Sequence, residues 1–387
     1  MPFPKIKGPT LKILHVITRL DMGGSSEAVL QIATAQKLYG HDVGVAYGMT
    51  TDHQDPTFFD RTGIPGYYVP ELVRELSPYS DTVAFLRLLA LTRSLKPDVL
   101  HTHSLKAGFL GRIAGRIAGA KAIVHSPHGH VFYGFFSPER TDHFVKLERF
   151  AARFCDRIIP LTETEASDYV RLKVAPKEKM LTAPMGIYLE RFKNPSKTRA
   201  EMRESLGVPV DAPVVGWIGR LDPIKDCRTF IASYELVRKE IPDVRYLIVG
   251  NGEERTALLE MTEKMGMDKV IMTGRRTDIS ELLNAMDMLA LTPINEGIGR
   301  VIIEAMAAGV PVAASAVGGV PELIGNAGIL IPPREPEALA SAVENILKHK
   351  NFRKQLIERG KLRAERYSIE ATVKTFEELY REILRTR

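Results

Sequence analysis

Residues 287–308, DMLALTPINEGIGRVIIEAMAA, hold the pattern that decides the fold. The short apolar run at its start is typical of a buried β-strand, and its end predicts a helix over 301–308 that stops at Gly309. Two carboxylates, Glu296 and Glu304, stand eight positions apart on either side of a glycine loop. Backbone N–H groups at a helix N-terminus suit phosphate, and carboxylates accept hydrogen bonds from sugar hydroxyls. The stretch therefore suggests a ligand that carries both sugar and phosphate.

The same alternation of short apolar strands and amphipathic helices runs through the rest of the chain. We predict strands at 11–18, 43–47, 98–103, 122–125 and 157–161, and then at 214–218, 245–249, 269–273, 288–291, 312–315 and 329–331. Strands that alternate with helices indicate a parallel sheet covered on both faces. The predicted fold class is therefore α/β, with two doubly wound, Rossmann-like domains that face each other across a cleft.

A chain of 387 residues is long enough for two domains. The segment 191–212 contains prolines, a glycine and a short charged helix, so we interpret it as the linker. This places an N-terminal domain at 1–190 and a C-terminal domain at 213–368. The last segment, 369–387, predicts an amphipathic helix that packs back on the N-terminal domain.

Composition excludes several classes of protein. A net charge of +6, spread over the whole chain, gives no reason to expect a nucleic-acid partner. The two cysteines, Cys155 and Cys227, lie too far apart in sequence to indicate a disulfide framework or a cysteine zinc site. The N-terminus has no secretory apolar region, and no apolar run approaches the about 18 residues of a membrane span. We therefore expect a cytoplasmic protein.

Cations and glycines follow several predicted strands. Arg220 and Lys225 come after the strand at 214–218, where they would neutralise a diphosphate, although a solvated pair of loop charges is the alternative. Gly23 and Gly24 precede the first helix, either to bring the backbone close to a diphosphate or as a plain connection. Two further strand ends carry Gly250, Asn251 and Arg275.

Histidines are concentrated in the first half of the sequence. His101 and His103 alternate so that both lie on one face of a strand, and His125 and His128 follow near the end of the next strand. Metal binding is conceivable, but no neighbouring carboxylate is in register with these histidines. We expect His128 to hydrogen-bond a sugar hydroxyl, and His101 and His125 to be core histidines with satisfied hydrogen bonds.

Two predicted helices are basic on one side and carry aromatic residues. Such helices lie on anionic membranes or, alternatively, are ordinary helices with a solvated charged face. The aromatic loop 131–136 favours the membrane or a lipid acceptor. The residues of this predicted membrane and acceptor surface are Arg112, Arg116, Lys146, Arg149 and Arg153.

Together these motifs resemble the retaining glycosyltransferases of family 4, which have the GT-B fold. The resemblance extends from about residue 11 to residue 385, and its most specific motifs lie in the C-terminal half. Segments 126–130 and 147–159 are similar to those of bacterial enzymes that build lipopolysaccharide, capsule or exopolysaccharide. The motifs that carry the resemblance are Glu296 with Glu304, Gly219-Arg220-Leu221 with Lys225, Val249-Gly250-Asn251-Gly252, and Gly23-Gly24.

The resemblance implies a role for each motif residue. Arg220 and Lys225 would hold the donor diphosphate, and Glu296 would hydrogen-bond the donor sugar. Glu304 would bind the ribose, and His128 would contact the donor sugar near the reacting carbon. The catalytic residues would be Glu296, His128, Arg220 and Lys225, and the remaining donor-binding residues Gly23, Gly24, Gly250, Asn251, Arg275, Gly297, Ile298, Gly299 and Glu304.

The resemblance also implies the reaction. A sugar would move with retention from a nucleotide-diphosphate sugar, a UDP-sugar, to a lipid-linked saccharide at the inner face of the cytoplasmic membrane. The sequence has no Asp-x-Asp motif, which agrees with transfer that needs neither metal nor cofactor. The alternatives are a small soluble acceptor, such as a carboxylic acid or an inositol phosphate, a sugar-nucleotide epimerase, or a non-catalytic subunit that binds sugar nucleotides.

Overall fold

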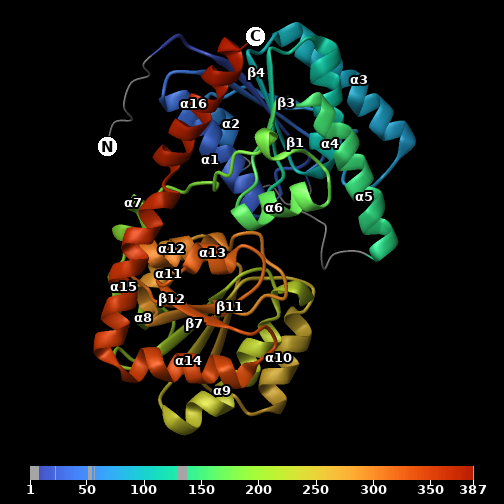
Figure 1. Ribbon diagram of the computed structural model, residues 1–387. Coiled ribbons are helices and arrows are strands. Elements are labelled where there is room, and N and C mark those ends of the chain that lie inside the picture. The colour runs from blue at the N-terminus through green and yellow to red at the C-terminus, as the bar shows by residue number, and fades with distance from the viewer. Residues whose placement is uncertain (1–7, 22, 51–54, 56, 130–136, 387) are drawn as a thin grey trace. The chain divides into compact units, whose positions relative to one another are not determined.

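In the computed structural model the chain forms two compact units (Figure 1). The first unit contains Met1–Ile187 and Ser368–Arg387, and the second contains Tyr188–Tyr367. The structure describes residues 8–21, 23–50, 55, 57–129 and 137–386. Among these residues no helix is both long and apolar enough to cross a membrane.

The first unit is built on a parallel sheet in the order β3-β2-β1-β4-β5-β6. Its strands are β1 (Lys12–Ile17), β2 (Asp42–Tyr47), β3 (Gly66–Tyr68), β4 (Val99–His103), β5 (Ala122–Ser126) and β6 (Arg157–Ile158). The central strands β4 and β5 are buried along their whole length, as expected for a sheet with helices on both faces. Parallel pairing aligns His15 of β1 with His101 of β4.

Helices cover the two faces of this first sheet (Figure 1). They are α1 (Gly24–Leu38), α2 (Phe58–Thr62), α3 (Pro78–Leu95), α4 (Leu105–Ala118), α5 (Pro138–Ala151), α6 (Glu163–Arg171) and α16 (Ile369–Arg385). Short 3₁₀ turns lie at η1 (Ala152–Phe154) and η2 (Lys177–Lys179). Ser77, Ser137 and Thr162 accept hydrogen bonds from backbone N–H groups at the starts of α3, α5 and α6, which explains where these helices begin.

The last helix, α16, belongs to the first unit, beside α1. Its apolar face buries Val373, Phe376 and Tyr380. Polar contacts anchor the first turn and the middle of the helix: Thr372 accepts a hydrogen bond from the amide of Gly186 (2.9 Å), and Glu377 pairs with His41 (2.5 Å). The final segment of the chain therefore completes the core of the first unit.

The second unit has a parallel sheet in the order β12-β11-β10-β7-β8-β9. Its strands are β7 (Val214–Ile218), β8 (Arg245–Val249), β9 (Val270–Gly274), β10 (Met288–Leu291), β11 (Val312–Ser315) and β12 (Gly328–Ile331). Its helices are α7 (Glu190–Lys193), α8 (Arg199–Ser205), α9 (Cys227–Glu240), α10 (Arg255–Lys264), α11 (Ile279–Ala285), α12 (Arg300–Ala308), α13 (Val320–Ile324), α14 (Pro336–Lys348) and α15 (Lys350–Ala364). The 3₁₀ turns are η3 (Pro223–Lys225) and η4 (Glu365–Tyr367).

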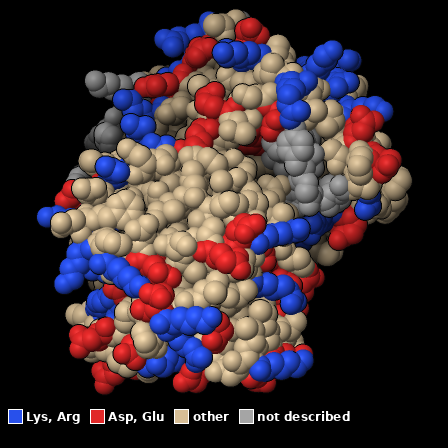
Figure 2. Space-filling model, turned by 60° about the horizontal axis from the view of Figure 1, so that its bottom comes forward, with Lys and Arg blue, Asp and Glu red and all other residues tan. Residues whose placement is uncertain are grey.

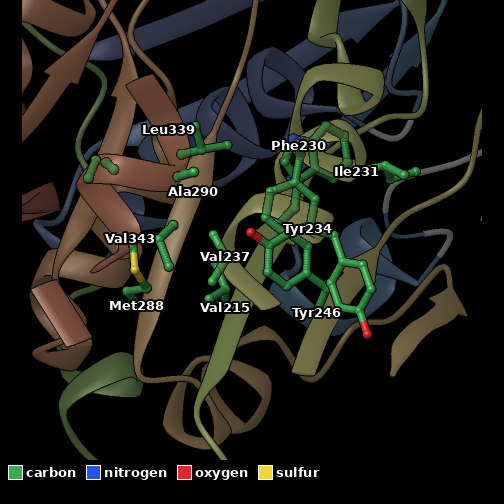
Figure 3. Packing of buried hydrophobic residues seen from close by; sticks show 14 of the residues in the cluster. Val215, Phe230, Ile231, Tyr234, Val237, Tyr246, Met288, Ala290, Leu339 and Val343 are labelled. Atoms are coloured by element: carbon green, nitrogen blue, oxygen red, sulfur yellow. The ribbon is translucent and has the colours of Figure 1, made fainter. Parts of the chain in front are cut away.

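The core of the second unit packs α9 and α14 against the sheet (Figure 3). Tyr246 of β8 stacks on Phe230 with ring centroids 4.4 Å apart and meets Tyr234 edge-on at 5.2 Å. The Tyr246 hydroxyl lies 3.0 Å from the Ser233 hydroxyl, so this buried polar group is satisfied.

Two doubly wound parallel sheets confirm the predicted α/β fold class. The segment 191–212, which we interpret as a linker, belongs to the second unit, where α8 packs on α11. Arg203 of α8 holds it there, because its guanidinium binds the carbonyl of Ala285 (3.0 Å) and the carboxylate of Asp287 (2.8 Å).

Candidate active site

The order of strands in the second sheet marks where a ligand would bind. From β7 the chain proceeds to β8 and β9 on one side, and β10, β11 and β12 follow on the other side. The loops after β7 and β10 therefore diverge at a topological switch point, where open α/β sheets bind their ligands. These two loops carry Arg220, Lys225 and Glu296.

Hydrogen bonds hold these two loops together. The hydroxyl of Thr292 donates to the carbonyl of Asp226 (2.7 Å) and accepts from the indole N–H of Trp217 (3.3 Å). The amide of Ile294 donates to the carbonyl of Ile224 (2.9 Å). Because Thr292 and Trp217 are fully buried, the hydrogen bonds of Thr292 hold the two loops in fixed positions.

Lys225 and Glu296 form an ion pair across the two loops. Their side chains are 20% and 15% exposed, so the pair is partly desolvated but open to a ligand. The second carboxylate oxygen of Glu296 accepts from the amide of Gly297 (3.1 Å). The structure thus joins two residues that the sequence assigns to different parts of the donor, the cation to the diphosphate and the carboxylate to the sugar.

Arg220 lies at the exposed rim of the same edge. Its guanidinium pairs with Asp222 at 2.8 Å, and its side chain is 64% exposed. An ion pair with this exposure contributes little to stability, so Arg220 can exchange Asp222 for another anion at small cost.

The N-terminus of α12 begins at a glycine that the backbone requires. Gly299 has φ of 71°, a left-handed conformation that disfavours any side chain, and it caps α12. Gly297 lies before it in the loop, while Ile298 is buried. Glu304, one turn into the helix, is 8% exposed.

The glycine turn after β8 has a clear packing role. A Cβ atom on Gly250 would lie 1.8 Å from the carbonyl oxygen of Gly219, and one on Gly252 would lie 2.5 Å from that of Leu221. Asn251 accepts a hydrogen bond through its carbonyl from the amide of Leu221 (3.0 Å). These glycines therefore let the turn lie against the Arg220 loop, and donor contacts of Gly250 and Asn251 stay a prediction.

Three other predicted donor residues lie at helix or strand ends. Arg275 is exposed directly after β9, at the edge of the second sheet. Gly23 caps the N-terminus of α1, and Gly24 is the first residue of that helix in the first unit. Both interpretations of Gly23 and Gly24, a phosphate contact and a plain connection, agree with this position.

His128 follows β5 in the first unit, in a left-handed backbone conformation with φ of 62°. Its Nε2 lies 2.9 Å from Nδ1 of His103, and Nε2 of His103 lies 2.9 Å from Nδ1 of His15. Burial lowers the pKa of His15 to about 4 and that of His103 well below its ordinary value. His15 and His103 are therefore uncharged at neutral pH.

Only part of the predicted basic surface is exposed to solvent. Arg112 is fully buried, so the prediction that it lies on a membrane or acceptor surface is wrong. Its Nε donates to the carbonyl of Gly108 (2.7 Å), and its Nη2 pairs with Glu148 of α5 (2.7 Å). The cause is the glycine face of α4, where a Cβ on Gly108 would lie 2.3 Å from His125, so the helix packs tightly on the sheet.

The other four cations are at least partly exposed. Arg116 pairs with Asp156 (3.1 Å), and Lys146 pairs with Asp142 (2.6 Å). Arg149 donates to the carbonyls of Leu172 (2.8 Å) and Lys173 (2.9 Å), next to the end of α6. Arg153 is exposed. The aromatic loop 131–136 lies outside the described residues.

Charges on the face in Figure 2 are mixed, with Lys and Arg lying among Asp and Glu. This distribution agrees with the modest net charge of +6. It gives that face no single-sign field of the kind that attracts nucleic acid.

Two family models match the chain. Residues 198–363 match "Glycosyl transferases group 1", and residues 23–186 match the "Glycosyl transferase 4-like domain". A relative from Escherichia coli, UDP-Gal:alpha-D-GlcNAc-diphosphoundecaprenol alpha-1,3-galactosyltransferase, is 30% identical over 77% of this chain and 77% of its own length. The chain belongs to the family-4 type of glycosyltransferases.

A second curated relative and two solved structures also resemble the chain. A D-inositol 3-phosphate glycosyltransferase from Saccharomonospora viridis is 28% identical over 94% of this chain and 90% of its own. HepE from Anabaena, solved with UDP and glucose, has a TM-score of 0.83 at 22% identity and covers 96% of this chain and 100% of its own. WaaG, a glycosyltransferase from lipopolysaccharide biosynthesis, has a TM-score of 0.74 at 19% identity and covers 95% of this chain and 99% of its own. The solved structures support the GT-B fold of this glycosyltransferase.

Sequence reasoning missed several residues that shape the glycosyltransferase site. Gly318, with φ of 52°, lies where a Cβ would approach the carbonyl oxygen of Glu296 to 1.9 Å, and the amide of Gly319 donates to that oxygen (3.2 Å). The double glycine after β11 is a signal that would have located them. Thr292, by contrast, acts through buried contacts with Trp217 and Asp226 that no local motif predicts.

Proposed function

We propose that this glycosyltransferase is a retaining, metal-independent enzyme that moves a sugar from a UDP-sugar to a lipid-linked saccharide in cell-surface polysaccharide biosynthesis. The observation that carries the proposal is the ion pair between Lys225 and Glu296 at the switch point of the second sheet. Lys225, a cation that can bind phosphate, meets Glu296, a carboxylate that can accept hydrogen bonds from hydroxyls. The loop after β7 that carries Lys225 also carries the exposed guanidinium of Arg220.

The pair suggests how the donor would engage. The diphosphate would take Lys225 as its partner, together with Arg220, and this exchange would release the carboxylate of Glu296 for sugar hydroxyls. The two cations would then offset the negative charge that grows on the diphosphate as its bond to the sugar breaks. A phosphate oxygen of the donor would assist removal of the acceptor hydroxyl proton on the same face, so the new bond keeps the configuration of the old one.

The UDP-sugar part of the proposal draws on the relatives. The name of the E. coli relative specifies UDP-Gal, and HepE binds UDP and glucose. The acceptor in the E. coli enzyme is a diphosphoundecaprenol-linked sugar, which supports a lipid-linked saccharide. The inositol 3-phosphate enzymes favour a second candidate, a small soluble phosphorylated acceptor.

Thermal-shift measurements with a panel of nucleotide sugars test the donor, because a ligand of the folded state raises the melting temperature. We expect UDP-sugars to raise it and GDP- and ADP-sugars to leave it unchanged. The Lys225→Met variant should lose the response. A response to GDP- or ADP-sugars alone would overturn the donor assignment. Transfer assays with an undecaprenyl-diphosphate sugar and with inositol phosphate then separate the two acceptors.

We also propose that α5 holds the enzyme at the inner face of the cytoplasmic membrane. Lys146 and Arg149 lie three positions apart on this helix, and Arg153 follows four positions later in η1. The ring of Phe150 between them is 46% exposed. Cations beside an exposed aromatic ring suit an anionic bilayer. Neutralising Lys146 and Arg153 with glutamine should weaken sedimentation with anionic vesicles at low salt. The matched control neutralises Lys239 and Lys264 in the second unit, and equal binding by both variants would contradict the proposal.

A further inference from the structure

A continuous chain of side-chain hydrogen bonds runs through the first unit to His128. The carbonyl oxygen of Gln36 on α1 lies 2.6 Å from Nε2 of His15. From there the chain continues through His103 to His128, with 2.9 Å at each step. Gln36, His15 and His103 are all 1% exposed or less.

The direction of this chain follows from counting protons. A neutral imidazole has one N–H donor and one lone pair, so a run of neutral rings donates in one direction only. The carbonyl oxygen of Gln36 can only accept, hence His15 carries its proton on Nε2. Nδ1 of His15 then accepts from Nε2–H of His103, and Nδ1 of His103 accepts from Nε2–H of His128.

A second set of contacts fixes the amide of Gln36. Its nitrogen lies 3.4 Å from the hydroxyl of Tyr380 on α16, and that hydroxyl lies 2.6 Å from Nδ1 of His101. Nε2 of His101 lies 2.8 Å from the hydroxyl of Ser126. Tyr380 can therefore donate to His101 and accept from Gln36, which keeps the carbonyl oxygen of Gln36 turned toward His15.

These bonds also explain why three buried histidines lie together. Ring nitrogens of His15, His101 and His103 lie within 4.8 Å of one another, a spacing that a metal ion also requires. In the chain described, the lone pair of each ring already accepts a hydrogen bond, from His103, Tyr380 and His128 respectively. A metal would have to displace all three bonds, so we favour the hydrogen-bond chain.

We propose that Gln36, His15 and His103 are positioning residues that hold the ring of His128 as its Nε2–H tautomer. The inference rests on the proposed function in one respect, that the ring of His128 takes part in the transfer of the sugar. The buried chain fixes the tautomer and the orientation of that ring in advance of binding.

Nitrogen NMR of histidine-labelled protein tests the tautomer directly, without substrate. Long-range proton–nitrogen spectra distinguish protonated from unprotonated ring nitrogens, and the His128→Gln variant identifies the signals of His128. We expect Nε2 of His128 to be protonated in the wild type. In Gln36→Met the anchor is lost, and the two nitrogens of His128 should move toward averaged values. A wild-type His128 protonated on Nδ1 instead would overturn the proposal, even if no variant folds.

Two further variants separate the effect of hydrogen-bond direction from the effect of changed side-chain packing. Gln36→Glu keeps an acceptor facing His15 and should retain the wild-type tautomer. Gln31→Met makes the same change as Gln36→Met on the same helix but outside the chain, since Gln31 bonds to Glu27 (2.8 Å), and should leave His128 unchanged. An unchanged tautomer in Gln36→Met would also overturn the proposal.

Kinetics connect the tautomer to the reaction. We expect Gln36→Met to lower kcat/KM for the donor by about tenfold, on the scale of one misdirected hydrogen bond, and Gln36→Glu to restore much of it. A wild type that shows the expected tautomer but transfers no sugar would refute the proposed function and leave the tautomer assignment standing. Equal kcat/KM in Gln36→Met and wild type would refute the link to the sugar.

Discussion

Lys225 and Glu296 are 71 positions apart in sequence, yet they form an ion pair between the loops that follow β7 and β10. The pair neutralises two charges that are largely buried. In the proposed function the donor diphosphate would break this pair, so donor affinity and the reactivity of Glu296 would be coupled through Lys225.

The first prediction concerns this pair. Glu296→Gln should lower the rate of sugar transfer on the order of 100-fold or more. The reason is that a neutral amide accepts hydrogen bonds from sugar hydroxyls less strongly than a carboxylate, and stabilises positive charge that develops on the sugar less well. The melting temperature should change by only a few degrees, since a partly exposed pair contributes about 1 kcal/mol or less. Glu240→Gln, which breaks the exposed pair with Lys348 at 2.7 Å, is the control and should retain full activity. Wild-type activity in Glu296→Gln would remove Glu296 from the site.

The second prediction uses Gly318, which lies against the carbonyl of Glu296. Gly318→Ala should destabilise the protein by about 2 kcal/mol more than Gly266→Ala, because the new methyl group meets backbone at 1.9 Å. Gly266 has a similar positive φ, 60° against 52°, but nothing lies within 4 Å of its Cβ position. Chemical denaturation measures the difference between the two variants. Equal losses of unfolding free energy in the two variants would contradict the prediction, because backbone strain alone would then account for the effect.

The third prediction concerns Glu165, a buried carboxyl at the start of α6. Burial raises the pKa of Glu165 from 4.5 to about 7, against the hydrogen bond that it accepts from the amide of Leu161 (2.7 Å). A pKa raised by folding stabilises the native state below about pH 4.5, and this contribution is lost as the pH rises to about 7.

Glu165→Gln should therefore become more stable relative to the wild type as the pH rises from about 5 to 8, by up to about 3 kcal/mol. The amide keeps an acceptor for Leu161 without a charge to bury. Melting temperatures across this range measure the trend. Glu163→Gln, an exposed change on the same turn, is the control for replacing a carboxylate by an amide in this helix. Parallel curves for Glu165→Gln and wild type would contradict the prediction.

The fourth prediction concerns the buried pair of Arg112 and Glu148. Arg112→Met should destabilise the protein by about 3–5 kcal/mol, because it leaves a buried carboxylate without its partner. Replacing both residues, Arg112→Met with Glu148→Leu, should recover much of the loss. Arg116→Met removes the cation of a half-exposed pair and should cost about 1 kcal/mol or less. Urea unfolding tests all three, and a mild effect of Arg112→Met would contradict the structure of this pair.

The sequence predicts most of the sheet framework because apolar strand patterns are local. The strands at 214–218, 288–291 and 312–315 have the predicted bounds, whereas β3, with three residues and little burial, has too weak a pattern to predict. The sequence also places Arg220 and Glu296 at strand ends on the same edge. It does not pair Glu296 with Lys225, since that contact depends on the order of the strands in the sheet.

The error at Arg112 has a physical cause that spacing does not reveal. Cations at helical intervals on α4 indicate a solvated face, but a cation can also lie buried when a neighbouring helix supplies a carboxylate. Glycines on α4 are the available signal, since Gly108 and Gly115 allow the helix to approach His125 and Leu100 closely. The histidine chain was unpredictable for a similar reason, because Gln36 and Tyr380 are 344 positions apart.

The position of α16 has a consequence for how the protein is made. Its residues leave the ribosome only after the whole second unit, yet Tyr380 and Thr372 bond to His101 and to Gly186 in the unit whose synthesis begins first. The second unit is in effect an insertion within the first, and it can fold while the first unit still lacks α16. Until α16 is synthesised, the nascent N-terminal half exposes the apolar surface that Phe376 later covers, so this is the stage at which a chaperone would protect it.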